Sequence, residues 1–402
     1  MVLPQALQYT PSIRSDFKYM HFKISVLLIS FVIFLMPVMA LADVVIRPIP
    51  APPIIGAKSY FVVDANTGYE FASVAPDKRL APASLTKLMT AYVVFKELTE
   101  HRIALDDQVK ISKKAWRTSG SRMFILVGTR VTVQDLLLGM IVQSGNDASV
   151  ALAEHVAVTE SLFTEMMNQY AAKLGMRSSH FENATGLPNE QHYSTARDLA
   201  TIARAIINEF PEYYKWYSMK QFEYNNISQN NRNSLLWRDP TVDGMKTGHT
   251  DDAGYCLIAS AKRDGMRIVS IVLGTASTKT RTDGSQSLIN YGFRFFETKL
   301  LYKAGEAITN ARIWKTSHEF TPLGLSEDLY ITVPRGSYDT VESILNIPAV
   351  LVGPITEGQP LAELKMRLND TDLVSQPLRA LNDNPSGSFW QRTRDSIKLW
   401  LN

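Results

Sequence analysis

The sequence predicts an α/β domain that is followed by a small all-β domain and an amphipathic C-terminal helix. Two strand-like segments, 59–74 and 254–275, enclose a series of helix-like segments, which indicates one domain whose sheet is completed by both of its ends. From about residue 303, short strand-like runs alternate with Gly, Pro, Asn and Asp. The chain has 402 residues, 45% of them hydrophobic, which is enough for two or three domains.

The N-terminal region has the pattern of an export signal. A basic stretch, an apolar run over residues 24–36 and the sequence ALA at 40–42 follow one another, as they do before a signal-peptidase site. We therefore predict a signal peptide within residues 1–42, with Met20 as an alternative start. The competing interpretation is an uncleaved anchor, but the apolar run is shorter than the ~20 residues that a membrane-spanning helix needs.

The charge of the mature chain argues against nucleic acid as a partner. Residues 1–42 contain three basic residues and one acidic residue, and removing them leaves 39 basic and 38 acidic side chains. A nearly neutral protein lacks the basic excess that general nucleic-acid binding requires.

Neither a disulfide nor a cofactor is expected. Cys256 is the only cysteine, so no intrachain disulfide can form, and within the strand-like sequence AGYCLIASA it is interpreted as a small buried hydrophobic residue. The seven histidines are scattered, and no metal-spaced Cys/His set, G-x-G-x-x-G or Walker A motif occurs. We expect no metal site.

The elements of the α/β domain follow from the spacing of apolar residues. A hairpin is predicted over 59–74, around an Asn-Thr-Gly turn, and a second over 254–275, with Asp264-Gly265 at its turn. A last helix at 287–301 would close the domain. The helices predicted between the hairpins cover residues 84–99, 133–144, 148–157, 161–175 and 195–210.

These patterns divide the chain into four regions. We predict a signal-peptide region, a catalytic domain, a small β-rich domain and a C-terminal amphipathic segment, with the bounds 1–42, 43–302, 303–384 and 385–402.

The sequence ASLTKLMTAY, residues 83–92, suggests a nucleophile beside a base. Ser84 and Lys87 lie three positions apart, which places their side chains one above the other on a helix. A lysine that is partly desolvated or near another cation can lose its proton and activate a serine hydroxyl. The motif alone is weak, because Ser15 and Lys18 have the same spacing.

Two further motifs strengthen this assignment. Ser144-Gly-Asn146 follows Ser84 after 60 residues, and Lys246-Thr-Gly follows Ser144 after 102 residues. S-x-N recurs elsewhere in the chain, whereas K-T-G occurs once. The combination S-x-x-K, S-x-N and K-T-G is the signature of penicillin-binding proteins and class A β-lactamases.

The mature chain resembles the serine-type D-alanyl-D-alanine carboxypeptidases, which are low-molecular-mass penicillin-binding proteins. The sequences GSRMFILVG, QSGNDASVALAEH, NRNSLLW and VDGMKTGHTDDAGYCLIASA are similar to that family. The resemblance implies a domain like those of serine transpeptidases and β-lactamases, with an antiparallel sheet and a helical subdomain. It also implies hydrolysis of the terminal D-alanine from peptidoglycan pentapeptides, and covalent inhibition by β-lactams.

The resemblance also implies roles for the motif residues. Ser84 would form an acyl-enzyme and Lys87 would be its base, with a pKa lowered by burial and by repulsion from Lys246. Ser144 would relay a proton to the leaving amine, and Asn146 would orient Lys87 and the substrate. The residues implied to bind the substrate, including the backbone N–H of His249 in the oxyanion hole, are Lys246, Thr247, Gly248, His249, Thr250 and Arg281.

Three alternative functions remain open. A class A β-lactamase has a glutamate and an asparagine in E-x-x-x-N spacing, and no such pair follows Ser144. A D,D-endopeptidase of the same superfamily is a closer alternative, although its usual form lacks the β-rich domain and the tail. A catalytically inactive wall-binding scaffold is disfavoured by the intact set of motifs.

The tail at 386–402 predicts where the protein resides. Phe389, Trp390, Ile397, Trp400 and Leu401 lie on one side of a helical wheel, with Arg392, Arg394, Asp395 and Lys398 mostly on the other. A short helix with two tryptophans and a positive charge suits a membrane interface. We therefore expect a periplasmic protein held at the periplasmic face of the inner membrane, although packing on the β-rich domain is an alternative.

Overall fold

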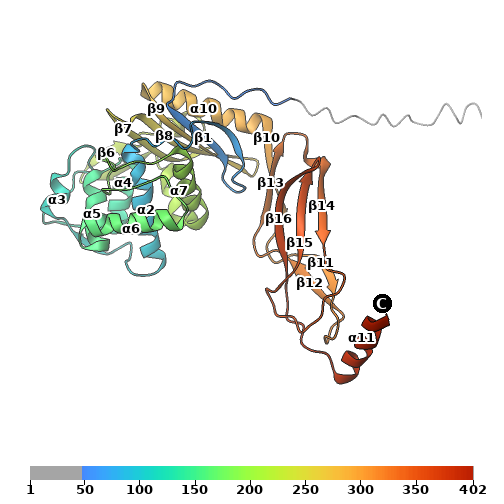
Figure 1. Cartoon of the computed structure of the whole chain (residues 1–402). Coiled ribbons are helices and arrows are strands. Elements are labelled where there is room, and N and C mark those ends of the chain that lie inside the picture. Colours follow the sequence, from blue (N-terminus) through green and yellow to red (C-terminus); the bar gives the residue numbers. More distant parts are fainter. Residues whose placement is uncertain (1–47, 402) are drawn as a thin grey trace, which may run out of the picture. The chain divides into compact units, whose positions relative to one another are not determined.

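The computed structural model describes residues 48–401, so the predicted signal peptide at 1–42 lies outside the described residues. The described chain forms an α/β part followed by a β-rich part and a terminal helix, α11 (Phe389–Leu401) (Figure 1). The predicted fold class is therefore confirmed. Within 48–401, no helix has the length and apolar character needed to cross a bilayer.

The α/β part is built on an antiparallel sheet with the strand order β2-β1-β9-β8-β7. The first two strands precede the helices in the chain and the last three follow them, as the enclosing strand patterns predicted. The five strands are β1 (Ser59–Asp64), β2 (Glu70–Val74), β7 (Val242–Thr250), β8 (Gly254–Arg263) and β9 (Met266–Thr275).

Both faces of this sheet are buried. Along β1, Phe61 and Val63 belong to one hydrophobic cluster, whereas Tyr60 and Val62 belong to another. This alternation is the two-residue period of a strand that is covered on both sides. One face is covered by α10 (Thr278–Phe295) and the other by the helical group that contains α2 and α7 (Figure 1).

The helical group lies between β2 and β7 in the sequence. Its main helices are α2 (Lys87–Thr99), α4 (Val133–Val142), α5 (Asn146–Ala157), α6 (Glu160–Lys173) and α7 (Ala196–Glu209). Its shorter elements are β3 (Gln108–Lys110), α3 (Lys113–Arg117), β4 (Arg130–Thr132), α8 (Pro211–Tyr214), β5 (Gln221–Tyr224), β6 (Ile227–Asn230) and α9 (Leu235–Arg238). Four of the main helices start close to a predicted boundary, whereas the segment predicted to begin a helix at residue 84 is a 3₁₀ turn, Ala83–Thr86, that leads into α2.

The helix predicted at 287–301 is displaced. It runs instead from Thr278 to Phe295 as α10, and residues Phe296–Tyr302 form strand β10. The earlier start follows from Ser277, whose hydroxyl accepts a hydrogen bond from the N–H of Thr280 and caps the helix. The helix ends where β10 begins to pair with β13 (Leu329–Pro334).

The β-rich part has a five-stranded antiparallel sheet with the order β11-β12-β16-β15-β14 and its own apolar core. Its strands are β11 (Ala307–Arg312), β12 (Phe320–Gly324), β14 (Val341–Asn346), β15 (Pro360–Leu368) and β16 (Thr371–Ala380). The proposed division of the chain at residues 302 and 384 stays a prediction.

Candidate active site

Ser84 and Lys87 lie at the junction between the 3₁₀ turn and α2. Ser84 belongs to the turn and lines a cleft of about 660 Å³, and Lys87 is the first residue of the helix. Leu85 and Leu88 are fully buried, so the turn is fixed against the core. The result is a serine hydroxyl at the cleft wall with a buried amine behind it.

The Nζ atom of Lys87 has three partners. It lies 2.9 Å from Ser84 Oγ, 2.7 Å from Asn146 Oδ1 and 2.5 Å from the carbonyl oxygen of Thr185. The amide group of Asn146 is oriented by its Nδ2, which donates to the carbonyl of Ser119 at 2.6 Å. Two of the partners of Lys87 can therefore only accept hydrogen bonds, while the serine hydroxyl can also donate one.

This arrangement suits a neutral amine. An uncharged Nζ has two N–H groups, which match the two carbonyl-type acceptors, and one lone pair, which is left for the hydroxyl proton of Ser84. Lys87 itself is only 2% exposed. Its geometry is that of a base poised to deprotonate Ser84.

The electrostatic environment lowers the pKa of Lys87 to about 7. Burial is the largest cause and the charge of Arg232 is the second, while Asp147 acts in the opposite direction. The sequence led us to expect that Lys246 would be the cation that lowers the pKa of Lys87, whereas in the structure that cation is Arg232. The pKa of Lys246 is in turn well below its usual value, because of burial first and then of Lys87, Arg232 and Arg281.

Ser144 and Lys246 form a second pair. Lys246 Nζ donates to Ser144 Oγ at 2.8 Å and to the carbonyl oxygen of Thr247 at 3.0 Å. Ser144 lies in the turn between α4 and α5 with φ +69, a left-handed conformation that costs a non-glycine residue about 1–2 kcal/mol. The strained turn presents the hydroxyl to the cleft, which Ser144 lines, while Lys246 behind it is buried.

Strand β7 forms one wall of the cleft, and its glycine permits close packing. A Cβ on Gly248 would lie 3.0 Å from the carbonyl oxygen of Pro82 and 3.3 Å from the Cβ of Ala83. The residue therefore lets the strand approach the turn that carries Ser84.

The neighbours of Gly248 on β7 also line the cleft. Thr247 is buried, and the ring of His249 packs on Tyr255 with 4.0 Å between ring centroids. The hydroxyl of Thr250 accepts a hydrogen bond from the N–H of Ala253 at 3.1 Å.

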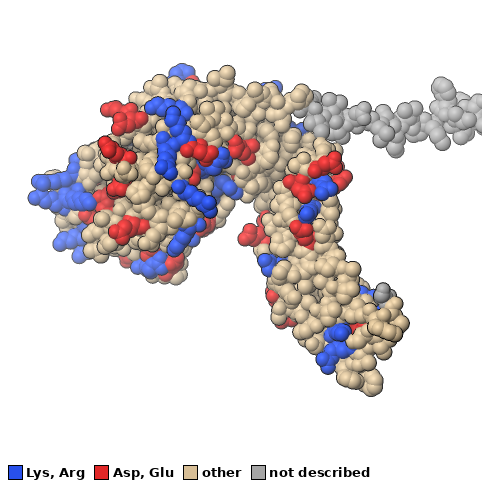
Figure 2. Space-filling model, in the orientation of Figure 1, with Lys and Arg blue, Asp and Glu red and all other residues tan. Residues whose placement is uncertain are grey.

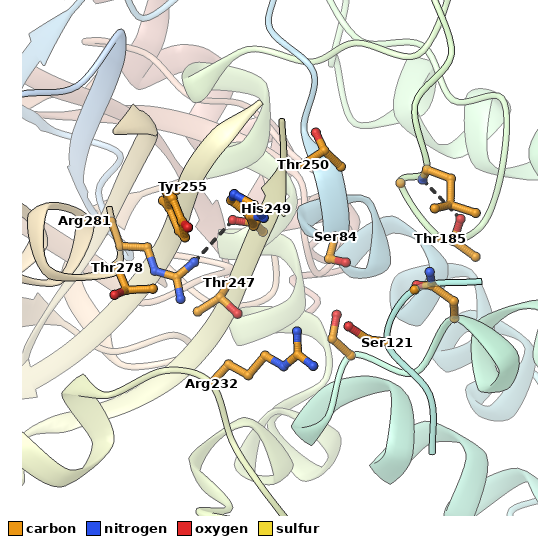
Figure 3. A pocket seen from close by; sticks show the side chains of 16 residues that line it. Ser84, Ser121, Thr185, Arg232, Thr247, His249, Thr250, Tyr255, Thr278 and Arg281 are labelled. Atoms are coloured by element: carbon orange, nitrogen blue, oxygen red, sulfur yellow. Dashed lines mark hydrogen bonds between the residues drawn. The ribbon is translucent and has the colours of Figure 1, made fainter. Parts of the chain in front are cut away.

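Arg281 reaches the cleft from α10. Its Nη1 donates to the carbonyl oxygens of Gly248 and Cys256, both at 3.3 Å, and its guanidinium lies over the ring of Tyr255 (Figure 3). The residue is 7% exposed, and burial lowers its pKa. Arg281 is thus a fixed cation with donors left for an anionic ligand.

The structure brings all ten predicted site residues to one region of the molecule. It also adds residues that sequence reasoning missed, among them Arg232, Thr185 and Ser121, whose side chains surround the same cleft (Figure 3). Arg232 lies in NRNSLLW, a sequence that pointed to the family without indicating a role. Among the described residues that line the cleft, none is acidic.

Two known protein families match most of the chain. Residues 47–277 match the family described as D-alanyl-D-alanine carboxypeptidase, and residues 296–386 match the domain described as penicillin-binding protein 5, C-terminal domain. The resemblance noted from the sequence is thereby confirmed.

Individual relatives cover most of the chain. It is 39% identical over 360 residues to the D-alanyl-D-alanine carboxypeptidase DacA of Escherichia coli, covering 87% of this chain and 89% of that protein. The crystal structure of penicillin-binding protein 5 from Haemophilus influenzae is 40% identical, with a TM-score of 0.79, and covers 84% of this chain and 100% of that chain.

A more distant relative has been solved with a β-lactam. Penicillin-binding protein D2 from Listeria monocytogenes, in its ampicillin-bound form, is 30% identical with a TM-score of 0.56 and covers 60% of this chain and 100% of that chain.

Proposed function

Because the chain belongs to the D-alanyl-D-alanine carboxypeptidase family, we propose that it removes the terminal D-alanine from peptidoglycan pentapeptides through an acyl-enzyme on Ser84. The contact between Lys87 Nζ and Ser84 Oγ carries this proposal, because the remaining partners of the amine accept hydrogen bonds. The pKa of about 7 for Lys87 makes the neutral amine available near neutral pH.

The first half of the reaction forms the acyl-enzyme. Lys87 takes the hydroxyl proton while Ser84 Oγ attacks the carbonyl carbon of the D-Ala-D-Ala bond. The backbone N–H groups of Ser84 and His249 would stabilise the developing oxyanion. When the tetrahedral species collapses, the C–N bond breaks and the proton that Lys87 took up is relayed through Ser144 to the amine of the departing D-alanine, which leaves Lys87 neutral for the second half. Ser144 is held for this relay by its hydrogen bond to Lys246.

The second half releases the shortened peptide. A water molecule attacks the ester carbonyl, its proton passes to Lys87, and the Ser84 Oγ–carbon bond breaks as the hydroxyl is reprotonated. The products are a tetrapeptide carboxylate and the unmodified enzyme. Asn146 holds Lys87 in place during both halves through its 2.7 Å hydrogen bond.

Specificity for a free C-terminus fits the cations on the β7 side of the cleft. The terminal carboxylate would bind Thr247 and Thr250, with Lys246 and Arg281 supplying positive charge. Arg281 is held by two main-chain carbonyls and stacks on Tyr255, so its direction is set before the substrate arrives. An amidated peptide would lose this interaction.

The same cleft is proposed to react with β-lactams, whose strained amide takes the place of the peptide bond. The ampicillin-bound relative supports this proposal. Because the described cleft residues include no carboxylate that could activate a water molecule as in class A β-lactamases, we expect slow release of the adduct and hence inhibition rather than resistance.

We propose that the protein is exported to the periplasm and lies against the periplasmic face of the inner membrane. The signal-like pattern before residue 43 supports export. Helix α11 supports peripheral attachment, since Trp390 and Trp400 are 79% and 84% exposed.

Mass spectrometry of a defined pentapeptide after incubation with the full mature chain tests the proposed activity. We expect the loss of one D-alanine, and no loss with the Ser84→Ala variant. Cleavage of crosslinked peptides without release of D-alanine would instead identify an endopeptidase. Failure of the wild type to form a stable radiolabelled penicillin adduct would favour the inactive scaffold.

A further inference from the structure

The surface formed by one segment beside the cleft is rich in positive charge. The segment 108–134 contains six basic residues and no acidic residue. Figure 2 shows Lys and Arg side chains gathered at the edge of the molecule where Figure 1 places α3. We call this surface the basic rim, and it consists of Lys110, Lys113, Lys114, Arg117, Arg122 and Arg130.

Most basic side chains of the rim form no ion pair among the described residues. Arg122 is partly exposed and the other five side chains are exposed. Among the described residues, only Lys114 of this set forms an ion pair, with Glu160 at 2.7 Å. Arg122 and Arg130 donate to main-chain carbonyls, which neutralise no charge. The surface is therefore complementary to a ligand with several negative charges.

The same segment is fixed to the catalytic helix α5. The carboxylate of Asp147 accepts hydrogen bonds from the N–H groups of Met123, Phe124 and Ile125 at 3.0, 3.0 and 3.3 Å. The N–H of Asn146 donates to the carbonyl of Ser121 at 2.7 Å. The residues that orient Lys87 thus also position the segment that carries the basic rim.

An exposed aromatic residue lies within this segment under strain. Phe124 has φ +67, a conformation that is unfavourable for a bulky side chain, and it is 47% exposed. Leu126 and Val127 beside it are 55% and 48% exposed. Strained and exposed apolar groups are typical of a binding surface.

We propose that the basic rim binds neighbouring peptide stems of the peptidoglycan polymer while one stem occupies the cleft. This inference rests on the proposed function. Each stem that is not crosslinked ends in a free carboxylate both before and after removal of D-alanine. The polymer therefore carries negative charges at intervals along its length. The segment that carries the rim also contains Gly120 and Ser121, which line the cleft, so the rim and the cleft are continuous. This continuity favours the substrate polymer over a membrane surface.

Charge reversal on α3 tests the proposal. The double variant Lys113→Glu, Arg117→Glu changes two exposed residues, four positions apart, that do not line the cleft. The variant Lys173→Glu, Arg177→Glu is the matched control, with the same change of charge and the same spacing at two exposed residues. Lys173 is the last residue of α6, and Arg177 follows the helix. Each protein is mixed with insoluble peptidoglycan sacculi and sedimented at low and at physiological salt.

We expect the α3 variant to bind sacculi about tenfold more weakly than the wild type at low salt, and the control variant to bind within about twofold. Sacculi whose carboxyl groups have been amidated should bind the wild type at least as weakly as native sacculi bind the α3 variant, because amidation removes the charges that face the rim and also those that enter the cleft. Turnover of a short pentapeptide at physiological salt should be equal for all three proteins, which also shows that the variants are folded.

Three results would overturn the proposal. The first is equal binding of the α3 variant and the control to sacculi, and the second is unchanged binding of the wild type to amidated sacculi. The third comes from the same sedimentation assay with phosphatidylglycerol vesicles in place of sacculi: the α3 variant binds the vesicles more weakly than the wild type does but binds sacculi equally well. The last result would assign the rim to a lipid surface. None of them depends on pentapeptide hydrolysis, so the proposed function stands or fails separately.

Discussion

At the scale of single residues, the buried amine of Lys87 governs the proposed chemistry. Lys87→Ala should reduce acylation by a radiolabelled penicillin by about 10²- to 10⁴-fold, because a positioned base contributes that much. The circular dichroism spectrum should be unchanged, since the substitution removes the buried amine and introduces no new charge. Acylation near the wild-type rate would exclude Lys87 as the base.

The pKa of Lys87 also sets a pH dependence. The neutral amine is the active form, and its fraction rises with pH, so the acylation rate should increase as the pH passes through about 7. Arg232 is the cation that lowers this pKa, and Arg232→Gln should therefore move the rise to higher pH. Stopped-flow acylation at several pH values measures both effects. A profile that does not move in the variant would show that burial alone sets the pKa.

The guanidinium of Arg281 is the residue-scale test of carboxylate recognition. Arg281→Ala should lower kcat/KM for pentapeptides by about ten- to a hundredfold, the loss expected for hydrogen bonds to a charged group. A C-terminally amidated peptide should be an equally poor substrate for both proteins. If the rate on the free acid is unchanged, Lys246 and the two threonines hold the carboxylate alone.

Sequence spacing located some of these residues and could not locate others. Ser84 and Lys87 were found because they lie three positions apart and because S-x-N and K-T-G follow them in the order of a known signature. Thr185 and Arg232 meet Lys87 only through the tertiary fold, 98 positions away in the case of Thr185. A main-chain carbonyl partner leaves no trace in residue type, so that contact could not be predicted.

At the scale of elements, the turn at 183–187 is a support for the base. Asn183 Oδ1 accepts hydrogen bonds from the N–H groups of Thr185, Gly186 and Leu187, at 3.1, 2.7 and 3.2 Å. The turn presents the Thr185 carbonyl to Lys87 at 2.5 Å. The conformation of this turn is therefore part of the site, although the side chain of Asn183 forms no hydrogen bond with Lys87.

We expect Asn183→Ala to loosen this turn. The free energy of unfolding should fall by about 1–3 kcal/mol, as for unsatisfied buried N–H groups. Penicillin acylation should slow by about ten- to a hundredfold, because a small displacement of a catalytic group is costly. Denaturant unfolding and acylation kinetics measure the two effects. An unfolding free energy that falls without any change in acylation would limit Asn183 to a structural role.

Element boundaries were predictable where local signals agreed. Apolar periodicity placed α7 within one residue at each end, and Thr195 caps its start by accepting from the N–H of Asp198. The helix predicted at 287–301 was correct up to Phe295 and wrong beyond it, because aromatic residues there satisfy both a helical and an alternating pattern. Residues 296–302 form strand β10 and not a helix because they pair with β13, a strand some thirty residues later in the chain.

At the scale of the whole molecule, α11 has two different sides. Asp395 is buried, and its carboxylate accepts a hydrogen bond from the N–H of Lys315 at 2.9 Å. Asp395 lies on the side of the helical wheel that holds the charged residues, and its contact attaches that side to the β-rich part. The tryptophans of the helix remain exposed, and membrane attachment stays a proposal.

A chain that ends at Asn384 tests the proposed membrane attachment. It should remain in the supernatant when membranes are sedimented, whereas the mature full-length protein should pellet, because the exposed apolar side of α11 supplies the attachment. Turnover of a soluble pentapeptide should be equal for both chains. Equal pelleting would show that α11 is not the anchor.

The single cysteine of the chain can report local opening of the folded protein. Cys256 is fully buried on β8, between β7 and β9, and burial raises its pKa. Its side chain belongs to the apolar cluster between the sheet and the helical group, so a thiol reagent can modify it only after this packing opens, and the labelling rate under native conditions reports the population of that open state. Since no second cysteine competes, the rate of one mass shift of the intact protein would measure how often the helical group separates from the sheet.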